Sequence, residues 1–205
     1  HIEFLAKASV TLIKGWGRFD DDHHILVSTV PGGAPEQRLY AERVLIGVGG
    51  RPQRPEIEGA ELGWVSDDMF LLERFPERMV VVGAGFIACE FAGILSGLGV
   101  DVTQLVRREQ LLRGFDAELA AVVQEGMAEK GVKVQFSTVP EAIEGTPGDL
   151  VVRTSRGDRI ACGGVLLATG RRPFLDGLNL DAAGVTTDGH HIPVDADQRT
   201  NVPHV

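Results

Sequence analysis

One segment, VVVGAGFIACEFAG at residues 80–93, constrains the fold of this chain more than any other. Three valines lead directly into Gly83-Ala84-Gly85, and small residues recur through the apolar run that follows. A buried strand, a glycine turn and a helix are expected in this order. Such a unit sets a helix N-terminus, with its free backbone N–H groups, at the end of a strand, and this arrangement binds the pyrophosphate of a dinucleotide.

The residues around this segment predict a βαβ unit. We expect a strand at 79–82, a helix at 86–98 and a second strand at 100–106, because apolar residues dominate each of them. Asp116 is expected to cap the next helix, which runs to Lys130. The fold class that follows is α/β, with a Rossmann-like NAD(P)H-binding domain and an added β-meander.

The chain after Lys130 is predicted to be mostly β-structure. Short runs rich in β-branched residues are separated by glycine and aspartate, which favours strands joined by turns. The strands are expected at 132–136, 141–145, 149–155, 158–164 and 165–170.

The two ends of the chain are predicted to belong together. Runs at 10–19, 23–30 and 43–48 predict a small β-meander, and the glycine- and proline-rich stretch 49–63 is typical of a connection between lobes. The tail 171–205 is too short to bury a core alone. We therefore expect it to pack against the front meander.

Composition limits the partners. The chain has 205 residues, 43% of them hydrophobic, and a net charge of −9. A strongly acidic protein lacks the broad basic face that nucleic-acid binding needs. No apolar run is long enough to span a bilayer. We expect neither nucleic acid nor a membrane as a partner.

The cysteines and paired histidines are weak candidates for a site. Cys89 and Cys162 stand in apolar or glycine-rich surroundings, so we expect small core residues, no disulfide, and a reducing compartment such as the cytoplasm. The pairs His23-His24 and His190-His191 lie in predicted turns, and adjacent strand residues point to opposite faces. We expect no metal site.

The three small residues of the turn have separate expected roles. Gly83 makes the tight turn, Gly85 lets phosphates approach the backbone, and Ala88 fills the third small position where helix meets strand. A glycine-rich turn without a ligand is the alternative. The context of strand, turn and helix favours the dinucleotide.

The end of the second strand indicates which dinucleotide. An NAD site carries an acid about 20 residues past the glycines, and this chain has Val106 followed by Arg107, Arg108 and Arg113. Guanidinium groups suit a 2′-phosphate, so NADP(H) is expected, with a solvated basic loop as the alternative. We expect changes at 106, 107 and 113 to lie outside the core contacts of the βαβ unit.

The segment VVVGAGFIACEFAGILSGLGVDVTQLVRREQLLRGFD resembles the NADPH-binding segment of the glutathione reductase-like flavoprotein disulfide reductases, the class I pyridine nucleotide-disulfide oxidoreductases. VLIGVGGRP, SDDMFLLERFPERM, LLATGRRP and VDADQRTNVPHV are similar, in that order, to other segments of the family. Val48 and Phe174 depart from its usual Thr and Asn.

The resemblance implies an FAD domain interrupted by an NADPH domain. Residues 1–51 then end the first FAD-domain segment, 52–170 form the NADPH-binding domain, and 171–205 begin the second FAD-domain segment. The chain is expected to be a fragment, without the redox cysteine pair, the catalytic His or any catalytic residue of its own. The parent is expected to be a homodimer through a C-terminal domain.

The resemblance also implies roles for particular residues. Arg107 and Arg113 match the arginines that grip the 2′-phosphate, and Arg108 matches a further basic position. Phe86 matches the lid of the nicotinamide pocket, and Glu90 matches the acid near the carboxamide. The expected cofactor-binding set is Gly83, Gly85, Phe86, Ile87, Ala88, Glu90, Arg107, Arg108, Arg113, Ala168, Thr169, Gly170 and Arg171.

The function that the resemblance implies is hydride transfer from NADPH to FAD and on to a small-molecule disulfide, with glutathione disulfide favoured. A trypanothione, mercuric or dihydrolipoamide reductase is the alternative within the same fold. A non-catalytic NADP(H)-binding module is the alternative outside it.

Overall fold

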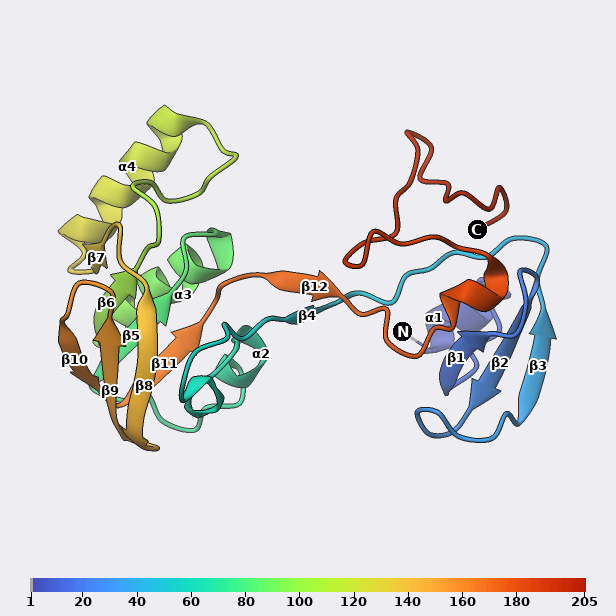
Figure 1. Ribbon diagram of the computed structural model, residues 1–205, viewed down its shortest axis with the longest axis horizontal. Coiled ribbons are helices and arrows are strands. Elements are labelled where there is room, and N and C mark those ends of the chain that lie inside the picture. Colours follow the sequence, from blue (N-terminus) through green and yellow to red (C-terminus); the bar gives the residue numbers. More distant parts are fainter. Residues whose placement is uncertain (1) are drawn as a thin grey trace. The chain divides into compact units, whose positions relative to one another are not determined.

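The computed structural model describes residues 2–205, so residue 1, the start of the expected segment 1–51, lies outside the described residues (Figure 1). The chain forms two compact units. The central unit is Arg51–Arg171, and the flanking unit combines the residues up to Gly50 with Arg172–Val205. Among the described residues, no helix is both long and apolar enough to cross a lipid bilayer.

A four-stranded parallel sheet forms the middle of the central unit. Its strands are β5 (Arg78–Val82), β6 (Asp101–Leu105), β7 (Lys133–Gln135) and β11 (Gly164–Leu167), in the order β11-β5-β6-β7. Because all four run the same way, their carboxyl ends share one edge of the sheet. The chain leaves β5 for β6 on one side and has β11 on the other, so the strand order reverses at β5.

Two helices cover one face of this sheet (Figure 1). Helix α3 (Phe86–Gly97) buries small residues against β5 and β6, and α4 (Ala117–Glu129) adds Met127 to the same layer. The Asp116 side chain accepts hydrogen bonds from the N–H groups of Glu118 and Leu119, so the predicted N-cap is confirmed.

A three-stranded antiparallel meander covers the other face. It consists of β8 (Pro140–Thr146), β9 (Asp149–Thr154) and β10 (Arg159–Cys162). Alternate residues of the parallel strands face the two layers: Met79 and Val81 face the helices, while Val80 and Val82 face the meander. The predicted α/β class with a Rossmann-like unit and a meander is confirmed.

The stretch 49–63 is not merely a connection between lobes. Most of it packs into the central unit, where Glu58 pairs with Ala142, and Trp64 just beyond it pairs with Leu166. A 3₁₀ turn, Ala60–Leu62, and the short helix α2 (Ser66–Met69) follow. These residues hold the start of α2 beside the end of β11.

The flanking unit brings the two ends of the chain into one small core. Helix α1 (Ile2–Lys7) precedes β1 (Trp16–Phe19), β2 (His24–Ser28) and β3 (Gln37–Tyr40), which form an antiparallel sheet. The buried residues come from the front of the chain and from the tail, which contains the 3₁₀ helix Leu180–Ala183. They are Phe19, Leu180, Ala183, Val185 and Val205.

Of the three predicted strands of the flanking unit, 23–30 is confirmed as β2, 10–19 is right only in its second part, and 43–48 is wrong. Residues 10–15 and 43–48 are not in strands, and β3 lies outside the three predicted runs. Val44 and Ile46 still contact the core, so their apolar side chains are used without a strand partner among the described residues. The short strands β4 (Gly50–Pro52) and β12 (Arg171–Pro173) form a two-stranded sheet.

Candidate dinucleotide site

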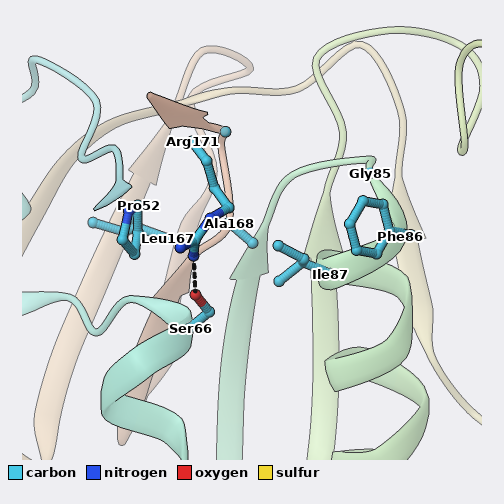
Figure 2. A pocket seen from close by; sticks show the side chains of 9 residues that line it. Pro52, Ser66, Gly85, Phe86, Ile87, Leu167, Ala168 and Arg171 are labelled. Carbon is cyan, nitrogen blue, oxygen red and sulfur yellow. Dashed lines mark hydrogen bonds between the residues drawn. The ribbon is translucent and has the colours of Figure 1, made fainter. Parts of the chain in front are cut away.

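A pocket of about 220 Å³ opens at the carboxyl edge of β5 and β11, where the strand order reverses (Figure 2). Ligands of open parallel sheets bind in this position. The pocket draws on four parts of the central unit: β4, the start of α2, the start of α3 and the turn after β11. Its lining residues are Pro52, Ser66, Gly85, Phe86, Ile87, Leu167, Ala168, Gly170 and Arg171.

Gly83 makes the tight turn at the end of β5. Its φ is +141°, and a Cβ built there would lie 2.3 Å from the carbonyl oxygen of Ala168 and 3.2 Å from the Cβ of Ala88. Its N–H donates to the carbonyl of Leu105 on β6 at 3.0 Å. Only glycine fits, because both the backbone angle and the neighbouring backbone exclude a side chain.

Gly85 differs from Gly83 in conformation and in free space. Its φ is −79°, it is the N-cap of α3, and a Cβ added to it would meet no atom within 4 Å. The fold therefore does not require glycine at this position. Glycine at Gly85 does suit a ligand that lies against the backbone, because no side chain then stands between the ligand and the start of α3. The first N–H groups of a helix have no partner one turn earlier and are free to bind such a ligand.

The residues after the turn divide between core and pocket. Ala88 is fully buried beneath the turn. The aromatic ring of Phe86, 56% exposed, and the side chain of Ile87 line the pocket. Glu90 is exposed on α3 and does not line the pocket.

The turn after β11 approaches the same pocket from the other side. Ala168 donates its N–H to Val82 on β5, and the Thr169 hydroxyl donates to the carbonyl of Gln53 at 3.1 Å. Gly170 has a φ of +144° and accepts a hydrogen bond from the N–H of Gln53. These bonds join the turn to the chain just after β4.

Arg171 extends toward the start of α2. Its Nη1 lies 3.5 Å from the Ser66 hydroxyl, as Figure 2 shows, and 3.6 Å from the carboxylate of Asp67. Sequence reasoning missed Pro52, Ser66 and Leu167 as lining residues. A glycine-proline stretch marked Pro52 and a buried strand marked Leu167, but no local pattern joins Ser66 to a residue 105 positions away.

The three arginines after β6 do not line this pocket. Arg107, Arg108 and Arg113 are exposed, and none of the ion pairs found within residues 2–205 involves them. Their loop is nonetheless tied to the glycine turn, because the N–H of Leu112 donates to the carbonyl of Ala84 at 2.7 Å. The loop carries three arginines and one acid, Glu109, and so offers net positive charge beside the turn.

Val106 corrects one expectation. Its side chain is 0% exposed and packs in the layer between the sheet and α3. It is therefore a core residue, and an acid introduced there would have to bury its charge. Of the three positions expected to lie outside the core, only 107 and 113 do so.

Both cysteines are core residues, as predicted. Cys89 packs in the layer under α3 and Cys162 packs in the layer under the meander, and neither forms a disulfide. Burial raises the pKa of each thiol above its usual value. A raised pKa disfavours the thiolate, so neither cysteine has the character of a nucleophile.

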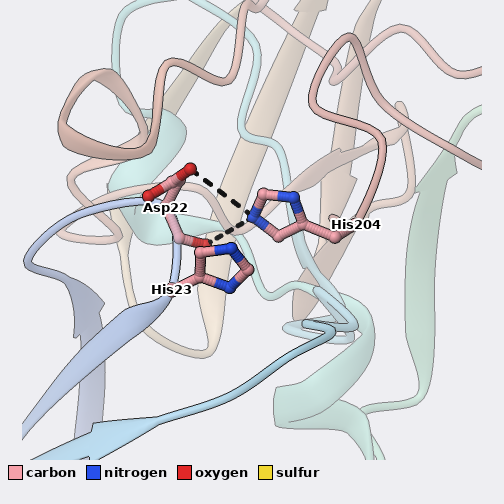
Figure 3. Close-up of side chains that lie close together, drawn as sticks. All are labelled: Asp22, His23 and His204. Carbon is pink, nitrogen blue, oxygen red and sulfur yellow. Dashed lines mark hydrogen bonds and ion pairs between the residues drawn. The ribbon is translucent and has the colours of Figure 1, made fainter.

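A cluster of two histidines and an aspartate lies in the flanking unit (Figure 3). The rings of His23 and His204 stack at 4.0 Å with an angle of 7° between their planes. Nε2 of His204 lies 2.9 Å from the carbonyl of Asp22, and Nδ1 of His23 lies 2.8 Å from the carbonyl of Ala41. A metal ion in the plane of one stacked ring lies outside the plane of the other, so this arrangement suits a hydrogen-bonded clasp better than a ligand set.

The neighbouring histidines belong to aspartate turns. Asp21 accepts hydrogen bonds from the N–H groups of His23 and His24, and Asp188 accepts them from those of His190 and His191. These bonds lower the pKa of both carboxyls, led by the N–H of His23 for Asp21 and that of His191 for Asp188. His23, His190 and His191 thus lie in turns that have their own hydrogen-bonded structure, while His24 begins β2.

Comparisons with known proteins agree with this geometry. The model of the family described as pyridine nucleotide-disulphide oxidoreductase matches residues 1–205. A glutathione reductase from Nostoc sp. is 41% identical over 90% of this chain and 39% of its own length. The mitochondrial thioredoxin reductase 2 of Drosophila melanogaster is 40% identical over 98% of this chain and 40% of its own length.

A solved structure supports the same fold. The HOCl-induced flavoprotein disulfide reductase RclA from Escherichia coli matches 99% of this chain and 47% of its own, with a TM-score of 0.86 and 22% sequence identity. The chain spans about two-fifths of the length of the curated relatives named above, 39% and 40%. It belongs to the pyridine nucleotide-disulphide oxidoreductase family.

Proposed function

We propose that the central unit binds NADP(H) at the carboxyl edge of β5, as the nucleotide domain of a flavoprotein disulfide reductase. The difference between the two glycines of the turn carries this proposal. Gly83 has no room for a side chain, whereas Gly85 has open space where a side chain would stand. The turn is thus tight within the fold and open toward a ligand, as a pyrophosphate site requires.

The residues along this edge suit the parts of the nucleotide in turn. The N–H groups that begin α3 suit the pyrophosphate, because a helix N-terminus attracts negative charge. Arg107, Arg108 and Arg113 suit the 2′-phosphate, because guanidinium groups bind phosphate through paired, charge-assisted hydrogen bonds. Phe86 and Ile87 give the pocket apolar surface that suits the nicotinamide ring.

The remaining residues of the expected set have supporting roles in this proposal. Ala88 lets α3 approach the glycine turn. Glu90, one helical turn after Phe86 on α3, would face the carboxamide of the nicotinamide. Ala168, Thr169, Gly170 and Arg171 form the opposite wall of the site. When bound, NADPH supplies a hydride. The residues of the two walls would hold the nicotinamide ring and keep water away from its reactive face.

For the whole protein we propose that this hydride passes through FAD to a disulfide. One NADPH and one proton then reduce one disulfide to two thiols. The flanking unit would belong to the FAD domain, as expected for the segments 1–51 and 171–205. Glutathione disulfide is favoured by two glutathione reductases, 41% and 37% identical to this chain. A protein disulfide is the second candidate, because a thioredoxin reductase is 40% identical.

The cellular setting proposed is a reducing compartment such as the cytoplasm, with the whole protein a homodimer. Two buried free thiols in the central unit support the first part. Neither nucleic acid nor a membrane is proposed as a partner, in keeping with the net charge of −9.

Calorimetric titration of the chain with NADPH and with NADH tests the nucleotide. We expect NADPH to bind at least about tenfold more tightly, because only it offers the arginines a phosphate. Arg107→Ala and Arg113→Ala should each weaken NADPH by about tenfold and leave NADH nearly unchanged. Arg156→Ala is the matched control, since Arg156 is an exposed arginine on the β9–β10 turn.

Two outcomes would contradict the assignment. Equal affinities of the unmodified chain for NADPH and NADH would remove the preference for the 2′-phosphate. Equal weakening of both nucleotides by the arginine substitutions would mean that the arginines contact a group the nucleotides share. For the whole protein, NADPH oxidation with glutathione disulfide and with an oxidised thioredoxin distinguishes the two candidate substrates.

A further inference from the structure

The most unusual side chain near the glycine turn is an amide inside an apolar layer. Gln104 lies on β6, is 0% exposed, and points to the same face as Val102 and Val106. In the sheet it stands between Val81 of β5 and Val134 of β7. Burying an amide among such neighbours costs stability unless its polar atoms are bonded.

Only one half of this amide has a partner. Its Nε2 donates to the carbonyl oxygen of Gly83 at 2.9 Å and lies 3.8 Å from the sulfur of Cys89. Its buried Oε1 has no hydrogen-bond partner among residues 2–205. An unbranched apolar side chain such as Met would fill the same space without an unbonded oxygen. Packing alone therefore does not explain glutamine at this position.

The bond to Gly83 fixes more than one atom. A trans peptide is planar, so its C=O and N–H point in opposite directions. When Gln104 holds the carbonyl of Gly83, it also sets the direction of the N–H of Ala84. Glycine at +141° is otherwise free to rotate, because it lacks the side chain that restricts other residues.

The next peptide of the turn is held in the same way. The carbonyl of Ala84 accepts a hydrogen bond from the N–H of Leu112 at 2.7 Å. Two successive peptides are thus fixed from outside the turn, one by β6 and one by the arginine loop. The second peptide links the turn to the loop proposed for the 2′-phosphate, while the first depends on Gln104 alone among the side chains described.

We propose that Gln104 is a positioning residue that presets the glycine turn for the pyrophosphate of the nucleotide. This inference rests on the proposed function of the central unit. Gln104 touches no nucleotide, since it is fully buried, and it acts through the carbonyl of Gly83. Preorganisation of this kind improves the binding of every ligand that contacts the glycine turn. It does not affect ligands that bind without contacting the turn.

The test compares Gln104→Met with Gln135→Met. Gln135 lies on the neighbouring strand β7 and also has a buried Oε1 without a partner among the described residues, but no side-chain bond joins it to the turn. Each variant is titrated by calorimetry with NADPH, NADH and 2′-AMP. The last compound carries the 2′-phosphate but no pyrophosphate.

We expect Gln104→Met to weaken NADPH and NADH by the same factor, about threefold to tenfold, the effect of one lost hydrogen bond. Binding of 2′-AMP should stay within about twofold of the unmodified chain, because it does not use the turn. Gln135→Met should change none of the three affinities. Urea unfolding should show Gln104→Met close in stability to the unmodified chain, because the lost bond to Gly83 is offset by removal of an unbonded buried oxygen.

Unchanged affinities for NADPH and NADH in Gln104→Met would overturn the proposal. So would an equal loss for 2′-AMP, because the effect would then not be confined to the turn. If Gln104→Met does not fold, Gln104→Asn decides in the same titrations, since it keeps the amide but is too short to reach Gly83. Failure of the proposed function is distinct, because the unmodified chain would then not bind NADPH.

Discussion

The central and flanking units bury very different amounts of apolar surface. The parallel sheet of the central unit has an apolar layer on each face, formed by the helices on one side and by the meander on the other. Within residues 2–205, the core cluster of the flanking unit has five buried hydrophobic residues, gathered from both ends of the chain. A two-layer core holds a rigid sheet edge, and the candidate site lies on that edge.

The flanking unit depends more on polar turns and local bonds. Carboxylates of Asp21, Asp188 and Asp195 each accept backbone N–H groups of their own turns. Large apolar side chains stay outside in both units, among them Leu45, 93% exposed, in the flanking unit and Phe70, 80% exposed, in the central unit. The central unit is therefore stabilised mainly by its core, whereas the flanking unit is ordered mainly by its turns.

The largest expected difference concerns the thiols, both of which lie in the central unit. Cys89 and Cys162 should react with an alkylating reagent at least about a thousandfold more slowly than in urea, because labelling requires the core to open. Labelling rates followed by mass spectrometry over a urea series check this. Fast labelling at low urea would mean that the core of the central unit opens easily, which would contradict its role as the stable unit.

A matched pair of leucines compares the two cores directly. Leu166→Ala removes a fully buried side chain from the central sheet and should lower the free energy of unfolding by about 3–4 kcal/mol. Leu180→Ala, in the small core of the flanking unit, should cost about 1–2 kcal/mol, because that site can collapse more easily. Urea unfolding measures both, and equal losses would remove the distinction.

The two glycines of the turn should separate stability from binding. Gly83→Ala should cost about 2–3 kcal/mol of stability, because φ is +141° and the added Cβ meets backbone. Gly85→Ala should change stability by less than about 1 kcal/mol and weaken NADPH by at least about tenfold. Thermal unfolding and calorimetry check the pair. A Gly85→Ala variant that binds NADPH normally would contradict the close approach of the phosphates.

The smallest expected effect is acid sensitivity of the flanking unit. The folded-state pKa values of Asp21 and Asp188 are lowered by N–H groups of their turns. Their stabilisation is therefore present above the unfolded-state pKa and is lost as the pH falls through the lowered folded-state value, below about pH 4.

The Asp21→Asn, Asp188→Asn double variant is the control for this effect. Asparagine can still accept the N–H groups but does not titrate. Circular dichroism between pH 2 and pH 6 should show a flatter stability profile for the variant. An unchanged profile would show that other carboxylates, such as Glu144 beside Arg159 and Arg153, govern the acid response.

Local patterns were sufficient for most of the central unit. The strand before Gly83, the helix after Gly85 and the cap at Asp116 follow from apolar periodicity and turn chemistry, which depend on neighbouring residues only. In the flanking unit these local patterns predicted β1 and β2 but failed at residues 10–15 and 43–48. Residues 43–48 have the composition of a strand, but a strand also needs a partner at the right distance, and composition does not supply one.

The amino-acid sequence is thus enough to predict the βαβ unit, its glycine turn and the family of the chain. The packing of distant elements is needed to show that Val106 is buried, that Arg171 reaches Ser66, that His23 stacks on His204, and that Gln104 holds Gly83. The last three join residues 21 to 181 positions apart. Such pairs form when elements pack, because chain-neighbour preferences act over a few residues and carry no information about which distant surfaces meet.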